Sequence, residues 1–259
     1  MGLFLFLGNK LLAFVSFLGG LFKLVTGTFF WMFQPSFKKE HVFEQAKKIG
    51  VDSLPIVSLV ALFIGIILAL QTAVLMQRLG SEMYIASIVA LSVVRELGPV
   101  LTALIIAGRS GASITAEIGT MTVTEQIDAL QTLATNPLQY LVVPRLLAAT
   151  LMLPILTLYS DIIGILGGYI ICVFKLNIAS SMYLNITFDA LLLKDLFTGL
   201  VKSVFFGMII AFVGCYEGFN VEGGAEGVGK ATTNSVVTTF ILIISADCFF
   251  TALFYFIFP

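Results

Sequence analysis

Arg95 and Glu96 are adjacent charged residues in the middle of a long apolar stretch, at about residues 83–107. A charged side chain at the centre of a membrane helix costs about 2.5–3.5 kcal/mol on insertion scales, so neither is expected to face lipid. Neighbouring residues of a helix point about 100° apart, which prevents these two from simply pairing with each other. Each is therefore predicted to have its partner on another helix, on another subunit or in a polar cavity.

Two interpretations of this pair follow from its position. In the functional one, Arg95 and Glu96 form a polar constriction or a headgroup site on a transport pathway. In the structural one, they join an interhelical ion pair with Asp247 or Asp161, which lie inside other apolar stretches. We favour the functional interpretation, because buried ion pairs contribute little net stability.

Other residues are candidates for the same pathway. Gly98 and Pro99 follow after Leu97, and proline has no N–H group, so a backbone carbonyl is expected to be free there. Gln71 lies in the first long apolar stretch and Asp247 near the centre of the last. Asp161 lies toward the outer end of its stretch and has no assigned role.

A short amphipathic segment lies within residues 108–140, between two apolar stretches. Thr122 and Glu125 have the spacing of a capping box, and Asp128 also suits the positively polarised start of a helix. The apolar side chains share one face of this predicted helix: Ile127, Leu130 and Leu133. Such a stripe is expected to press against the membrane surface, the protein's own helices or a partner.

Five apolar stretches are long enough to cross a bilayer, which takes about 20 residues. They lie at about 54–76, 83–107, 141–173, 196–216 and 235–258, and each is predicted to be a helix because backbone groups in lipid must bond within their own segment. Residues 1–33 form a sixth block, interrupted by Lys23 and three glycines, where we expect an interfacial or re-entrant helix pair. The chain is thus predicted to be one all-α integral membrane domain, 1–259, with an interfacial segment at 1–33 and a five-helix bundle at 54–258.

The composition excludes several classes of protein. Of 259 residues, 59% are hydrophobic and 11% charged, whereas soluble domains carry about 25% charged residues. A net charge of −1 without a basic run longer than two residues argues against nucleic-acid binding. One histidine and three widely separated cysteines predict no metal site, and the sequence contains no evident catalytic set. An intramembrane enzyme is therefore the least favoured class.

The segment Gly224–Ala231 nearly matches a phosphate-binding loop. Its last position is Ala231, which has no hydroxyl for magnesium, and a predicted membrane helix precedes it instead of a strand. We interpret it as a flexible glycine-rich turn that binds no nucleotide. Uphill transport would then draw on an ion gradient or on another polypeptide. Two alternatives stay open here: an ion-coupled secondary transporter that uses the intramembrane charges, and a structural membrane anchor.

The distribution of basic residues predicts the orientation of the chain. With five spans and a cytoplasmic N-terminus, one set of basic residues is cytoplasmic: Lys38, Lys39, Lys47, Lys48, Arg109, Arg145 and Lys230. A smaller set is on the far side: Arg78, Lys175, Lys194 and Lys202. The excess follows the positive-inside rule and leaves the C-terminus outside.

The block Leu91–Ala148 closely resembles the permeases of the MlaE/YrbE family of lipid-transporting ABC systems. Five motifs occur in the family's order and spacing: RELGPV (95–100), AGRSG (107–111), AEIGTM (116–121), TEQIDAL (124–130) and NPLQYLVVPR (136–145). Two more, GKATTNSVV (229–237) and ADCFFTALF (246–254), are similar to the family's final loop and last helix. The resemblance covers about residues 40–259.

This resemblance implies a non-catalytic permease subunit that moves phospholipid between the inner and outer membranes. The implied protein is a multi-pass homodimer in a bacterial inner membrane, or in the inner envelope of a plastid, with its N-terminus cytoplasmic and its C-terminus periplasmic. A cytoplasmic ATPase subunit would hold ATP and magnesium, so no cofactor is expected in this chain. A periplasmic MCE-domain protein would cap the outer face.

The resemblance also implies roles for particular residues. The segment 124–133 would be the coupling helix that docks on the ATPase, through Thr124, Glu125, Gln126, Ile127, Asp128, Leu130 and Leu133. An outward-facing cavity would hold lipid, with Arg95, Glu96, Gly98 and Pro99 at its base. To these implied pathway residues we add Gln71 and Asp247 as our own candidates.

Overall fold

The computed structural model describes residues 2–32, 34 and 39–257, and every regular element in that part of the chain is a helix. The elements follow in this order: α1 (Gly2–Met32), α2 (Lys39–Ile49), η1 (Val51–Ser53), α3 (Leu54–Arg78), η2 (Glu82–Tyr84), α4 (Ile85–Ser92), η3 (Val93–Leu97), α5 (Gly98–Ile106), η4 (Ala107–Gly111), α6 (Ala112–Val123), α7 (Gln126–Thr132), η5 (Leu138–Val142), α8 (Val143–Phe174), α9 (Ser180–Ala190), α10 (Leu193–Phe219) and α11 (Gly224–Ile257). The predicted limits at residues 1, 33 and 258 lie outside the described residues.

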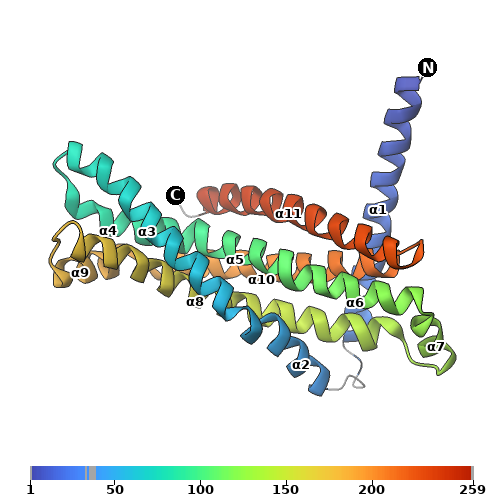
Figure 1. Ribbon diagram of the computed structural model, residues 1–259. Helices are drawn as coiled ribbons and strands as arrows, with labels where there is room; N and C mark the ends of the chain where they lie inside the picture. Colours follow the sequence, from blue (N-terminus) through green and yellow to red (C-terminus); the bar gives the residue numbers. More distant parts are fainter. Residues whose placement is uncertain (1, 33, 35–38, 258–259) are drawn as a thin grey trace.

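The protein is an all-α integral membrane protein, as predicted. Among the described residues, six helices are long and apolar enough to cross a membrane. Five of them correspond to the predicted spans: α3, the continuous helix from η2 to α6, η5 with α8, α10, and α11. These helices run side by side in one elongated bundle (Figure 1).

The sixth candidate lies in α1, which is a single continuous helix. The predicted re-entrant pair is therefore wrong: Gly19, Gly20 and Gly27 are accommodated within the helix. Figure 1 shows α1 running across the direction of the bundle helices. Its second half packs on the bundle, where the Phe17 and Tyr216 rings pack in a T-shaped pair with centroids 5.1 Å apart. The interfacial placement of this helix stays a prediction.

The second membrane helix extends further than predicted. The second span was predicted to end at about residue 107, yet η4 and α6 continue the helix to Val123. Some of their small and polar residues, such as Thr115 and Gly119, are buried against the neighbouring helices. The hydroxyl of Thr115 donates to the Gly214 carbonyl oxygen at 3.1 Å and lies 2.8 Å from the hydroxyl of Ser235.

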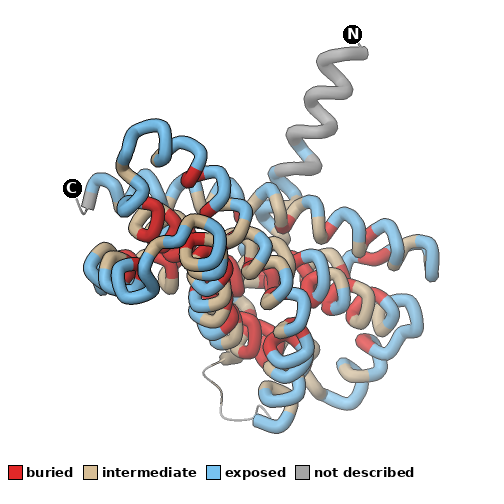
Figure 2. The backbone as a smooth tube through the Cα atoms, turned by 60° about the vertical axis from the view of Figure 1, so that its left-hand side comes forward, coloured by how far each residue is buried: buried red, intermediate tan, exposed pale blue. Residues whose placement is uncertain are grey.

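Helices α3 and α8 pack closely through glycine. A methyl group at Gly65 would collide with the backbone of Gly164, and one at Gly167 would collide with the Leu62 carbonyl. Backbones that approach this closely are typical of small-residue interfaces in membranes. Figure 2 shows the buried residues along the inner sides of the helices and exposed residues along the outer ones. Many of the outer residues are large and apolar, such as Phe63 on α3 and Ile162 on α8, as lipid-facing surfaces require.

Two local predictions near the chain's turns are wrong. The predicted capping box does not form, because the Thr122 hydroxyl bonds to the carbonyl oxygens of Ile118 and Gly218 inside α6. Glu125 precedes α7 with φ 58° and no side-chain cap. The glycine-rich segment 224–231 is also not a flexible turn, because it forms the first turns of α11.

Candidate functional site

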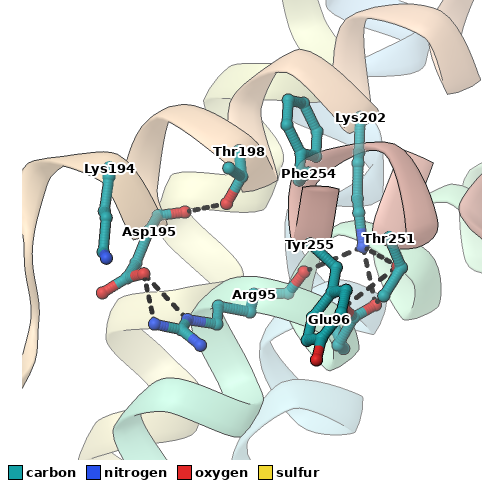
Figure 3. A pocket seen from close by; sticks show the side chains of 9 residues that line it. All are labelled: Arg95, Glu96, Lys194, Asp195, Thr198, Lys202, Thr251, Phe254 and Tyr255. Atoms are coloured by element: carbon teal, nitrogen blue, oxygen red, sulfur yellow. Dashed lines mark hydrogen bonds and ion pairs between the residues drawn. The ribbon is translucent and has the colours of Figure 1, made fainter. Parts of the chain in front are cut away.

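The site is built around η3, a π-helical turn that contains Arg95 and Glu96. The Gly98 amide donates to the Val93 carbonyl, and Pro99 has no amide hydrogen to donate. π-Turns are uncommon and frequently occur at functional sites. Here the turn directs both charged side chains toward α10, where Asp195 and Lys202 lie two helical turns apart on one face (Figure 3).

Arg95 pairs with Asp195 at the start of α10. Oδ1 of Asp195 lies 2.8 Å from Nε and 2.7 Å from Nη2 of the arginine. Oδ2 accepts a hydrogen bond from the Leu192 amide at 3.0 Å, so the carboxylate also caps the helix. The Asp195 side chain is buried and that of Arg95 is half-exposed. A fixed carboxylate thus holds a half-exposed guanidinium whose third nitrogen, Nη1, makes no hydrogen bond among the described residues.

Lys202 is the centre of a second cluster. Its side chain is 2% exposed, and Nζ lies 2.7 Å from Glu96 Oε2 and 2.9 Å from Asp247 Oδ1. The same nitrogen donates to Thr251 Oγ1 at 2.7 Å and to the Arg95 carbonyl oxygen at 3.3 Å. Because Pro99 cannot donate to that carbonyl, the lysine serves as its partner. One buried cation therefore ties η3 to both α10 and α11.

These groups line a cavity of about 170 Å³ (Figure 3). Its wall consists of Arg95, Glu96, Lys194, Asp195, Thr198, Lys202, Thr251, Phe254 and Tyr255. A second, more open hollow of about 480 Å³ shares three of these residues and is otherwise mainly apolar, with Ala252 and Phe256 in its wall. The two together offer charged groups beside an apolar trough, which suits an amphipathic molecule.

The predicted pathway residues divide into two groups. Arg95, Glu96 and Asp247 come together in this site, with partners on other helices, as the sequence required. Gly98 and Pro99 are buried beside the cavity and do not line it. Gln71 is exposed on α3 and lies outside both hollows.

The structural interpretation, an interhelical ion pair, predicted the wrong partners for Arg95. Arg95 pairs with Asp195 instead of Asp247 or Asp161, and Asp247 pairs with Lys202. Lys202 was expected at the far surface of the membrane, but it is buried within α10. Its position inside a predicted span was the signal that could have identified it.

Asp161 instead packs against Gly98, next to the π-turn. The aspartate is 5% exposed, and a methyl group at Gly98 would collide with its Oδ1 atom. We expect Gly98→Ala to lower the free energy of unfolding by about 1–3 kcal/mol through this overpacking. Thermal unfolding in detergent measures the effect.

The Asp161→Ala substitution provides the test of that cause. It should remove most of the destabilisation of Gly98→Ala in the double variant, because the collision disappears. Gly229→Ala is the matched control, since a methyl group there meets no atom within 4 Å. If the two substitutions change the free energy of unfolding by fully additive amounts, the assigned contact between Gly98 and Asp161 is contradicted.

Helix α7 is shorter than predicted, at Gln126–Thr132, and its apolar stripe is divided. Ile127 is buried and Leu130 packs against the core, whereas Leu133 at the helix end is 74% exposed. The predicted polar members of the segment are all exposed: Thr124, Glu125, Gln126 and Asp128. The helix is thus anchored by two apolar residues and presents the others outward.

The fold and the site define a multi-pass membrane protein with a charged, partly buried pocket between its helices. The chain belongs to the MlaE permease family, whose description is "Permease MlaE" and whose profile matches residues 42–253. It is 50% identical over 212 residues to a protein of Rickettsia typhi named "Probable ABC transporter permease protein", with 82% of each chain covered. A Synechocystis protein of the same description is 42% identical over 228 residues, which is 88% of this chain and 87% of that one. One from Pyropia yezoensis is 43% identical over 204 residues, which cover 79% of this chain and 78% of the other.

Proposed function

We propose that this chain is the permease subunit of an ABC transporter that moves phospholipid between the inner and outer membranes. The observation that carries the proposal is the charged cavity joined to an apolar trough. The half-exposed guanidinium of Arg95 and the ammonium of the neighbouring Lys194 suit a phosphate group, and the trough beside Phe256 suits acyl chains. Family membership and the names of the relatives support the transport role.

In this proposal the chain has no catalytic role and no cofactor of its own. A separate ATPase subunit binds ATP and magnesium and docks on α7. The protein acts as a homodimer, and exposed apolar residues along α11, such as Ile241 and Phe249, support a further contact of that helix with a second copy or with lipid. A periplasmic MCE-domain protein exchanges lipid at the other end of the bundle.

In the proposed mechanism, the helices that carry the ion pairs shift relative to one another. Nucleotide-driven closure of the ATPases draws the α7 helices together and shifts α10 and α11 against η3. Because Lys202 bridges Glu96 and Asp247, such a shift changes the shape of the cavity and displaces the headgroup. The bacterial inner membrane, or a plastid inner envelope, is the proposed location, with the N-terminus in the cytoplasm and the C-terminus in the periplasm.

A pull-down from the native membrane in mild detergent tests this function. We expect mass spectrometry of the tagged chain to find an ABC ATPase, an MCE-domain protein and bound phospholipid together. An unrelated multi-pass protein, tagged in the same way, controls for lipid carried over by the detergent. If the chain purifies without an ATPase or specific lipid, an ion-coupled secondary transporter replaces the proposal.

A further inference from the structure

A second polar cavity, of about 320 Å³, lies between α2, η1 and the η4–α6 segment. Arg109, which helps to line it, follows Arg95 by 14 residues along the same helix. At about 1.5 Å per residue, the two arginines are roughly 20 Å apart along the helix axis. The cavity is therefore separate from the site beside Lys202 and lies toward the end of the bundle that carries α7.

Arg109 is held in place on one side only. Its Nη1 atom donates to the hydroxyl of the buried Ser53 at 2.7 Å and to the Lys48 carbonyl oxygen at 3.1 Å. Nε and Nη2 make no hydrogen bond among the residues that the structure describes. A guanidinium fixed in this way presents its remaining nitrogens as a fork, which matches two oxygens of a phosphate.

A buried hydroxyl in the cavity wall also lacks a partner. Ser110 is 5% exposed, and its Oγ atom makes no hydrogen bond within the described residues. Buried hydroxyls are normally satisfied, so an unsatisfied one next to a cavity indicates a missing partner. The hydroxyl of Ser113 lines the same space and offers a further donor.

The wall also contains two carboxylates, and only one of them is neutralised. Glu117 is the neutralised one, paired with Arg145 at 2.9 Å and with Lys48 at 3.2 Å. Asp52 lines the cavity and forms no ion pair in the described part of the chain, not even with Arg109 across the same space. The cavity therefore presents a free cationic fork and a separate free carboxylate, an arrangement complementary to a ligand that carries both charges.

We propose that this cavity binds a phosphate diester that carries a primary amine, the chemistry of an ethanolamine phospholipid headgroup. The phosphate lies on the Arg109 fork and the hydroxyls of Ser110 and Ser113, and the ammonium lies on Asp52. The site is distinct from the transport pathway and does not depend on the proposed function. It gives the α7 end of the bundle a means to recognise one class of headgroup.

A fluorophore at Gln45, which lines the cavity, tests the proposal directly. Gln45→Cys is made in a Cys248→Ser background, because Cys172 and Cys215 are buried and Cys248 is exposed. The full-length labelled chain in detergent is titrated with short-chain phosphatidylethanolamine, phosphatidylglycerol of equal chain length, glycerophosphoethanolamine and inorganic phosphate. We expect the ethanolamine lipid to bind at least tenfold more tightly than the glycerol lipid.

Two substitutions separate the two halves of the ligand. Arg109→Gln should weaken the binding of both lipids about tenfold. Asp52→Asn should remove the preference for ethanolamine and leave the affinity for the glycerol lipid unchanged. Among the described residues the Asp52 side chain has no hydrogen-bond or ion-pair partner that the second change would disturb, so that arm remains valid even if Arg109→Gln impairs folding. Lys47→Gln, an exposed change on α2, is the control and should have no effect.

The outcomes are decisive in each arm. Equal binding of glycerophosphoethanolamine and the lipid supports the site and identifies a soluble ligand as sufficient, whereas binding of the lipid alone identifies a membrane source. If inorganic phosphate binds as tightly as the ethanolamine lipid, the amine part of the proposal is overturned. An absent response, or one that neither Arg109→Gln nor Asp52→Asn alters, overturns the site.

Discussion

Replacing Lys202 with methionine is expected to abolish transport and to lower the free energy of unfolding by about 3–5 kcal/mol. The lysine is 2% exposed and neutralises both Glu96 and Asp247. Without it, two carboxylates remain close together in a membrane helix bundle with no cation between them. Phospholipid transfer between reconstituted vesicles and thermal unfolding in detergent measure the two effects.

A charge-neutral triple variant separates function from stability. Glu96→Gln, Asp247→Asn and Lys202→Met together should recover most of the lost stability, because replacing a whole buried ion cluster is often nearly neutral. Transport should remain absent in that variant. Lys175→Met, at an exposed lysine beyond α8, is the control and should resemble the wild type. Normal transport by the triple variant would show that the cluster only holds the helices together.

Replacing Leu133 with aspartate is expected to weaken ATPase binding at least tenfold without changing thermal stability. The side chain is 74% exposed at the end of α7, so it contributes little to the fold but much to an apolar docking surface. Co-purification with the ATPase and the rate of lipid-stimulated ATP hydrolysis provide the measurement.

Leu130→Asp gives the matched comparison on the same helix. Leu130 packs against the protein's own core, so this change should also lower the unfolding temperature. A Leu133→Asp variant that binds the ATPase normally and still transports would contradict the assignment of α7 as the coupling helix.

The membrane helices could be predicted from sequence because length and apolar composition decide them. The first span was predicted at residues 54–76 and α3 is Leu54–Arg78. The continuation of the second helix to Val123 could not be predicted in this way, because its glycine, serine and threonine residues make the segment less apolar than a membrane span. Thr115 and Thr122 hydrogen-bond to carbonyl oxygens of α10, and these contacts exist only in the assembled bundle.

The site was partly predictable for a similar reason. The cost of burying Arg95 and Glu96 required partners on other helices, and this requirement is met. The identity of the partners depends on the π-turn and on the rotation of α10, neither of which has a sequence pattern of its own. The capping box failed because the Thr122 hydroxyl finds acceptors at Ile118 and Gly218, which a local motif does not represent.

Photo-crosslinking at Tyr255 in the intact transporter tests the central claim most directly. A benzophenone amino acid at this position lines both hollows of the site, and one at Leu151, exposed on the outside of α8, reports on bulk lipid. We expect phospholipid adducts at both positions, with those at position 255 falling at least fivefold when the ATPase is trapped with nucleotide and those at 151 unchanged. An ATP-coupled lipid pathway through this site would be contradicted if no adducts form at position 255. It would also be contradicted if their yield, like that at position 151, is the same in both nucleotide states.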